Sequence, residues 1–320
     1  MGHPCRMKSR VHPKYKTRYR VTNWREYESG LVQRGDVTVW LSPDALKAWR
    51  AKPTGRRGAQ PKFSDLAIET ALTMRLVFHL PLRQSEGFLG SIFKLMGVDL
   101  AVPDHTTLSR RSASLDVSLT RSQGKGPIVL IIDSSGLAAV GEGEWSAAKH
   151  GGTGRRGWKK LHLGVDASGE IMAQVLTDSN VDDGSTGIGI IKGVPGGVES
   201  VIADTAYDSR PIYEAAESKG AEVIVPPARN AQTSKGRVKC KQRDRTIRRV
   251  KEVGLRQWKK DSGYHRQGRV ENTFFRYKAI LGDRLRSRTL VNQETEVRLA
   301  CNVLNRMRQL GWPVSEKVAC

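Results

Sequence analysis

Residues 128–133, IVLIID, constrain the fold of this chain more than any other feature. Five consecutive aliphatic residues are too few to span a bilayer, and they are typical of a central strand that is buried on both faces. Such a strand needs helices to cover it, which predicts an α/β fold. The run ends in Asp133, and in an open sheet functional groups gather where strands end. An acid is also a common way to end a buried strand, so Asp133 alone does not define a site.

The elements around this strand follow from periodicity and from turn and cap residues. We expect a hairpin of residues 160–165 and 170–177, joined by a turn at Asp166–Gly169, and further strands at 200–203 and 221–225. Helices are expected at 64–79, 82–96, 104–118, 183–192 and 211–219, from Tyr264 towards Leu281, and at 293–310.

The positive charge is concentrated in two segments. The chain of 320 residues has a net charge of +22. Residues 1–62 hold 15 Lys and Arg against 4 Asp and Glu, and residues 229–260 hold 13 against 2, while the rest of the chain is balanced. Either run alone could be a solvated face or a disordered tail, but the two together favour contact with nucleic acid.

This distribution suggests three regions. Residues 1–62 are expected to form a basic, partly ordered arm and linker, and residues 63–125 a helical region that resembles a helix-turn-helix module or is a plain helical bundle. Residues 126–320 form the α/β domain, with a basic insertion at about 229–260. Four widely spaced cysteines and the absence of an apolar stretch after the N-terminus favour a cytoplasmic chain without a disulfide framework or secretory signal.

Two further acids complete a pattern with Asp133. Asp204 follows the short strand VIA, after 70 intervening residues, and Glu271 follows after 66 more, on a predicted helix. Lys278 lies seven residues after Glu271, almost two full helical turns, so the two share one face. Tyr264 lies seven residues before Glu271 and would share that face if the helix extends so far back.

This pattern resembles the DDE-type insertion-sequence transposases, and most closely their insertion-sequence-five family. The resemblance is found in IIDSSGL, GWKKLHLGVD, VIADTAYDS and YHRQGRVENTFFRYK, and in the N-terminal NWREYESGLVQRGDVTVWLS and GRRGAQPKFSD. It covers nearly the whole chain. The Arg of the family's Tyr, Arg, Glu, Lys signature is replaced by Gln267, between Arg266 and Arg269.

The resemblance implies a ribonuclease H-like core in which Asp133, Asp204 and Glu271 are the catalytic and metal-binding residues. They would hold two Mg²⁺ ions, for which Mn²⁺ can substitute, with Asp133 between the metals and the other two acids on either side. Carboxylate oxygens suit such hard cations, whereas His or Cys would favour softer ones. Lys278, Arg266 and Arg269, with Tyr264, would contact DNA near the metals.

Other residues are expected to contact DNA further from the acids. They are Thr106, Thr107, Arg110 and Arg111 on the third helix, and Arg155, Arg156, Trp158 and Lys159 at the hairpin tip. Trp258, the one aromatic residue in the basic insertion, would either stack on a base or anchor the insertion to the core. The insertion itself is expected to be poorly ordered without DNA.

The nearby polar residues have simpler interpretations. His162 lies in an alternating strand and is interpreted as structural. Asp182 and Asp183 are expected to be loop or cap residues, although either could be an outer ligand of the metals, and Asp208 is interpreted as a helix cap.

The sequence therefore predicts a transposase that binds the terminal inverted repeats of its element, cuts there and joins the ends to target DNA. A homodimer on double-stranded DNA is expected, at the bacterial nucleoid and without a membrane. The alternatives are a non-catalytic sequence-specific DNA-binding protein and a ribonuclease H-like nuclease without strand transfer.

Overall fold

The computed structural model describes residues 19–318, apart from 54, 56, 123–125, 140–156 and 235–239. The chain divides into two compact units, one of residues 1–39 and 307–320 and the other of residues 40–306. No described helix is both long and apolar enough to cross a membrane.

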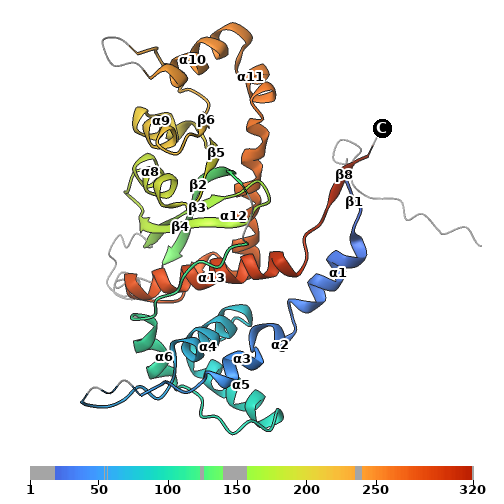
Figure 1. The fold of residues 1–320 in the computed structure, drawn as a ribbon, viewed down its shortest axis with the longest axis vertical. Helices are drawn as coiled ribbons and strands as arrows, with labels where there is room; N and C mark the ends of the chain where they lie inside the picture. Colours follow the sequence, from blue (N-terminus) through green and yellow to red (C-terminus); the bar gives the residue numbers. More distant parts are fainter. Residues whose placement is uncertain are drawn as a thin grey trace, which may run out of the picture. The chain divides into compact units, whose positions relative to one another are not determined.

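The larger unit is built around a mixed sheet of six strands (Figure 1). The strands are β2 (Ile128–Ala139), β3 (Trp158–Val165), β4 (Ile171–Asp178), β5 (Val198–Ile202), β6 (Glu222–Ile224) and β7 (Arg284–Leu285). Their order is β4-β3-β2-β5-β6, with β7 paired to the far end of β2. The first three strands are antiparallel, whereas β5, β6 and β7 run parallel to their neighbours. This mixed sheet, flanked by helices, is the ribonuclease H-like arrangement that the resemblance implied.

Helices cover both faces of this sheet (Figure 1). Helices α8 (Asp183–Gly193) and α9 (Arg210–Glu217) pack on one face, and α12 (Gly268–Leu281) packs on the other. Leu130 and Ile132 of β2 are fully buried in the core with α8 and α9. The prediction of a central strand at residues 128–132 is confirmed, but the strand continues to Ala139, because residues 131–138 pair with β3.

The helical region is made of α4 (Asp65–Val77), α5 (Leu82–Leu95) and α6 (His105–Ser112). Ser64 and Asp104 cap α4 and α6 as predicted, accepting the amides of Ala67 and Thr107. The third helix was expected to reach Ser118 but ends at Ser112. The chain beyond is extended, since Asn302 and Asn305 of α13 (Leu290–Leu310) bind the backbone at residues 118–120.

The basic N-terminal region is more ordered than expected in its described part. It contains β1 (Tyr19–Val21), α1 (Trp24–Gln33), α2 (Val37–Trp40) and α3 (Pro43–Lys47). Trp40 and Trp49 are buried, and the Trp49 indole donates to the Ala101 carbonyl at 2.8 Å. Apolar burial therefore holds residues 40–49 to the larger unit.

In the smaller unit, the two ends of the chain meet. Strand β1 pairs antiparallel with β8 (Ser315–Lys317), from Tyr19 with Lys317 to Val21 with Ser315. The Asn23 side chain joins the same two segments through the Trp312 carbonyl and the Val314 amide. A Cβ at Gly30 would lie 2.6 Å from the Leu310 carbonyl oxygen, so α1 approaches α13 at a position that requires glycine.

Candidate active site

Asp133 and Asp204 lie on neighbouring strands, at the level where β5 ends. Ile131 of β2 pairs with Ile202 of the parallel strand β5, and each aspartate lies two residues further on. Asp204 follows the end of β5, whereas Asp133 lies within β2 and pairs with Leu163 of β3. The Asp133 carboxylate accepts the amide of Ser134 at 2.8 Å, and that of Asp204 accepts the amide of Ala206 at 2.9 Å. Neither bond neutralises a charge, so both carboxylates remain without a cationic partner in the described ion pairs.

Glu271 is the third acid, and it comes from α12, which packs on the face of the sheet opposite α8 and α9. It lies in the first turn of α12, where a negative charge is stabilised by the helix dipole, and it is exposed. Burial raises the pKa of Asp133 to about 6, against the opposing effect of the Ser134 amide, and the charges of Asp204, Glu271 and Asp183 raise it further. The acids predicted from sequence thus interact electrostatically at one place.

Asp183 is a fourth carboxylate at this site. It accepts hydrogen bonds from Lys160 Nζ at 3.0 Å and from Ser134 Oγ at 3.1 Å. Burial raises the pKa of Asp204 despite the Ala206 amide, and the charge of Asp183 adds to this effect. Asp182, by contrast, is the N-cap of α8 and accepts the amide of Ser185 at 2.7 Å. Of the two alternatives left open by the sequence, Asp183 is the one that faces the other acids.

Two buried rings lie behind the carboxylates. His162 is fully buried; its Nε2 bonds Thr177 Oγ1 at 2.8 Å, and burial lowers its pKa. Tyr207 is 1% exposed, and its hydroxyl has no hydrogen-bond partner in the described part of the chain. Burial raises the pKa of Tyr207, and the charges of Asp183, Asp133 and Asp204 raise it further, so the phenol remains neutral.

Tyr207 was not predicted as a site residue, and Asp183 was predicted only as a cap residue or, with Asp182, as a possible outer ligand. For Tyr207 the available signal was its place three residues after Asp204, within DTAYDS. For Asp183 it was only the position at a helix start, which a cap explains equally well.

The basic side of the site comes from α12 and the turn before it. Lys278 Nζ donates to Ser135 Oγ of β2 at 2.8 Å. Tyr264 is half-buried; burial raises its pKa, and the charges of Asp204, Glu271 and Asp133 add to the shift. Both residues therefore lie at the carboxylates.

Glu271 and Lys278 lie seven residues apart on α12, as expected, but the helix does not extend back to Tyr264, which was the condition for all three to share one face. Residues 264–267 make a 3-10 turn, and α12 begins at Gly268. Gly263 precedes the turn with a φ of 72°, a conformation that favours glycine and that ends the preceding helix.

Gln267, which replaces the signature's Arg, is buried beneath β2. Its Nε2 donates to the Ile132 carbonyl at 3.3 Å, and its Oε1 has no partner among the described residues. A side chain in this place supports the strand and does not reach the solvent. Arg266 and Arg269 on either side are exposed and able to meet a phosphate.

The donor set fits a divalent cation. It consists of carboxylates, the ligands that Mg²⁺ and Mn²⁺ prefer. Burial and the neighbouring carboxylates raise the pKa of Asp133, and a bound cation would oppose both effects. In the described residues, no group of three or more His, Cys, Asp or Glu side chains could hold one metal ion together. Asp133 with Asp204, and Asp133 with Glu271, are the pairs that would hold divalent cations here.

From Lys241 onward the basic insertion is helical, and it is attached to the loop after Asp204. This part forms α10 (Lys241–Val253) and α11 (Leu255–Asp261), whereas the sequence predicted a segment that is poorly ordered without DNA. The physical reason is Asp208, whose side chain is 1% exposed and binds Arg243 Nε and Nη2 at 2.7 and 2.9 Å. Asp208 also accepts the Ala228 amide, so it joins loop to insertion and does not cap α9, whose N-cap is Ser209.

Trp258 of α11 is packed against the turn that leads to α12. It is 6% exposed, and its ring centroid lies 6.2 Å from that of Tyr264. Lys259 Nζ lies over the same tyrosine ring at 4.7 Å. Of the two roles predicted for Trp258, this geometry favours the anchor.

The residues predicted to contact DNA on α6 fall into two pairs. Thr106 and Arg110 are exposed and one turn apart. Thr106 and Thr107 both donate to the capping Asp104, and Arg111 is paired with Asp65 and bonds the Phe63 carbonyl at 3.0 Å. Thr107 and Arg111 are half-buried, whereas Thr106 and Arg110 are exposed, so the exposed surface of these four consists of Arg110 and of Thr106, whose hydroxyl oxygen can still accept a hydrogen bond.

At the hairpin, Arg155 and Arg156 lie outside the described residues. Trp158 is 47% exposed. Its indole lies against Gly136 of β2, since a Cβ at Gly136 would lie 3.3 Å from the ring. Lys159 is paired with Asp178 of β4. Trp158 is therefore the exposed aromatic residue of this strand.

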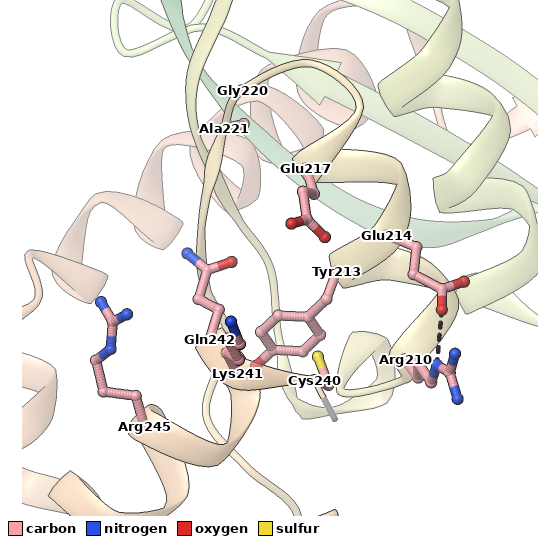
Figure 2. Close-up of a pocket in the computed structure, with 10 residues that line it drawn as sticks. All are labelled: Arg210, Tyr213, Glu214, Glu217, Gly220, Ala221, Cys240, Lys241, Gln242 and Arg245. Atoms are coloured by element: carbon pink, nitrogen blue, oxygen red, sulfur yellow. Dashed lines mark hydrogen bonds and ion pairs between the residues drawn. The ribbon is translucent and has the colours of Figure 1, made fainter. Parts of the chain in front are cut away.

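A pocket of about 600 Å³ lies between α9 and the start of α10 (Figure 2). Basic and acidic residues line it together, and Arg210 is already paired with Glu214 at 2.6 Å. It contains none of the four carboxylates of the site. Its mixed, self-paired charges do not define a second site.

The comparisons with known proteins agree with the site. A family model described as transposase DDE domain matches residues 124–306, and another with the same description matches residues 32–142. The chain therefore belongs to the transposase DDE domain family, whose members are metal-dependent enzymes that cleave DNA and transfer its strands.

Among solved structures, a cryo-EM structure of the piggyBac transposase synaptic complex with hairpin DNA is similar. Its identity is 9% over 92% of this chain and 82% of that chain, with a TM-score of 0.38. No feature of the site depends on this likeness.

Proposed function

We propose that this transposase binds the terminal inverted repeats of its own insertion sequence, cleaves there and joins the ends to target DNA with two Mg²⁺ ions. The observation that supports this most is the interaction of Asp133 with Asp204 and Glu271 at the level where β5 ends, with Lys278 bonded to Ser135 two residues along β2. An insertion-sequence-five type of enzyme, acting as a homodimer at the nucleoid, is the form we propose.

The acidic and the basic residues of the site have different roles in this proposal. Asp133, Asp204 and Glu271 would hold the metals, and Asp183 would orient Lys160 and Ser134 beside them. When bound, two divalent cations activate an attacking hydroxyl and stabilise a leaving oxygen. Lys278, Arg266 and Arg269 would contact the phosphates on either side and place the scissile bond against the carboxylates.

Recognition would come from residues 1–120. Thr106 and Arg110 form the exposed face of α6, and hydroxyl and guanidinium groups suit base edges and phosphates. The α/β domain, from residue 126 onward, would supply the chemistry, and the insertion at 229–260 would add positive charge near the cleavage point.

One assay tests the proposal against its alternatives. The full chain is incubated with Mg²⁺ and a labelled duplex that contains the terminal repeat, beside a scrambled duplex. Cleavage of the repeat followed by joining to a second DNA is the expected result. Binding without cleavage would indicate a DNA-binding protein, and cleavage without joining a nuclease. Mn²⁺ and Ca²⁺ in place of Mg²⁺ test the metal preference.

A further inference from the structure

A second cavity, of about 660 Å³, lies away from the carboxylates, between the helical region and the start of α13. Arg75 and His79 line it from α4 and the residues that follow, and Arg286 and Arg288 line it from the segment before α13. None of its described lining residues is acidic. This distinguishes it from the pocket of Figure 2, where Glu214 and Glu217 accompany the basic residues.

Arg75 is the most unusual member of this cavity. It is 8% exposed, and its Nε has no hydrogen-bond partner in the part of the chain that the structure describes. Burial lowers its pKa, Glu296 opposes this effect, and the nearby Arg286 lowers the pKa further. A buried guanidinium with an unused donor is costly unless an anion compensates it.

The carboxylate that interacts with Arg75 is Glu296. Both oxygens of Glu296 accept backbone amides, from Arg286 and Ser287, each at 2.8 Å, and neither is bonded to a guanidinium among the described contacts. The cavity is lined by Arg75, Arg286 and Arg288, so one acid stands against three guanidinium groups. The cavity keeps an excess of positive charge.

His79 has an uncommon backbone conformation and contacts one of these guanidinium groups, that of Arg286. His79 has a φ of 56°, which is uncommon for a residue with a side chain. In this conformation its Nδ1 lies 3.0 Å from Arg286 Nη2. Since a guanidinium can only donate, Nδ1 accepts, and the strain at His79 serves to orient Arg286.

The start of α13 adds a helix N-terminus. This helix has 21 residues and no acid in its first turn, so no carboxylate of its own compensates its positive end, although the Thr289 hydroxyl accepts the amide of Asn292 at 3.4 Å. Thr289 and Asn292 line the cavity there. Ser109, on α6 between Thr106 and Arg110, lines the other side.

From these features we propose that the cavity binds a phosphate of the DNA backbone, held by Arg75, Arg286 and Arg288 at the N-terminus of α13. The phosphate would belong to the duplex that α6 contacts, since Ser109 joins the cavity to the exposed face of that helix. The inference rests on the proposed function only in taking DNA as the ligand.

The test uses a random-sequence duplex without divalent metal, so that neither end recognition nor cleavage enters. Affinity is measured by fluorescence anisotropy over a series of salt concentrations for the wild type, Arg288→Ala and Arg75→Met. Lys192→Ala is the matched control, because it removes one exposed positive charge at the end of α8 and lines neither pocket.

We expect each cavity variant to bind on the order of tenfold more weakly and to reduce the slope of log K against log salt by about 0.9, the value for one phosphate contact. Lys192→Ala should leave the slope unchanged. Inorganic phosphate, added without DNA, should raise the melting temperature of the wild type more than that of Arg288→Ala. Arg288 is exposed, so this variant is expected to fold.

Slopes equal to that of the control for both cavity variants would overturn the inference, as would equal stabilisation of wild type and Arg288→Ala by phosphate. A wild type that binds terminal-repeat and random duplexes equally would contradict the proposed end recognition, while the contrast between cavity variants and control would still support the phosphate site.

Discussion

Asp204 and Asp208 lie four residues apart in the same loop, yet their surroundings are opposite. Asp208 is 1% exposed at its side chain and is bound by two nitrogens of Arg243, Nε and Nη2, and by the Ala228 amide. The Asp204 carboxylate accepts only the Ala206 amide among the described hydrogen bonds and lies near the carboxylate of Asp183. A carboxylate whose charge is compensated by the protein stabilises the fold, whereas one left uncompensated is available for a metal ion.

The largest expected effect is at the uncompensated carboxylates. Asp133→Ala, Asp204→Ala and Glu271→Ala should each abolish cleavage. The loss of cleavage rate should exceed the about 10–100-fold that follows when a residue behind a metal ligand is removed. Binding of terminal-repeat DNA, measured by gel shift, should survive. A variant that still cleaves would remove its residue from the metal site.

At Asp208, whose charge is compensated by Arg243, we expect a substitution to lower the stability of the fold. Asp208→Ala leaves Arg243 without its partner and should lower the free energy of unfolding by about 3–5 kcal/mol. Urea denaturation measures this change, and Asp204→Ala is the matched control, since it removes the same group from the same loop. Equal stability of the two variants would break the contrast between the aspartates.

The insertion that Arg243 attaches allows a similar contrast between two tryptophans. Trp258 is buried, so Trp258→Ala should lower the free energy of unfolding by about 3 kcal/mol without DNA. Trp158 is exposed, so Trp158→Ala should leave melting unchanged and weaken DNA binding, since a stacked base contributes about 1–3 kcal/mol. Unchanged melting of Trp258→Ala together with weaker cleavage would favour base stacking by Trp258 instead.

The smallest effect concerns pH. The pKa of Asp133 is about 6 in the folded chain, above the ordinary value of 3.8, so between these values the folded state binds more protons than the unfolded state. The free energy of unfolding therefore falls as pH rises through this window. Without divalent metal, Asp133→Asn should melt a few degrees higher than the wild type above pH about 6.

The difference should vanish near pH about 4, where the wild-type carboxyl is protonated in the folded state. Differential scanning fluorimetry with a chelator measures it. A difference that does not change with pH would mean that the asparagine acts through packing and not through charge.

The parts of the fold that depend on local sequence were predictable. Ser64 and Asp104 mark helix starts because a cap needs only a side chain and an amide three residues away. The strand at residues 128–132 and the hairpin turn at Asp166–Gly169 were equally local. The three acids required a resemblance, because no local rule links Asp133 with Glu271.

The features that the sequence left open or missed depend on contacts between distant segments. The choice between Asp182 and Asp183 was open because Asp183 differs from its neighbour in facing Lys160, which lies on strand β3. The order of the insertion depends on Arg243 meeting Asp208, 35 residues away. The end of α6 at Ser112 depends on Asn302 and Asn305 of the last helix. Periodicity contains no information on such pairs.

The pairing of β1 with β8 has a consequence for synthesis. Thr22 bonds Val314 across 292 residues, so strand β1 has no partner until residues 315–317 have been translated. At about 5–20 residues per second, this is a delay of about 15–60 s on the ribosome. The sheet of the larger unit is complete by residue 285 and can form before then, whereas β1 can pair only after β8 has been made.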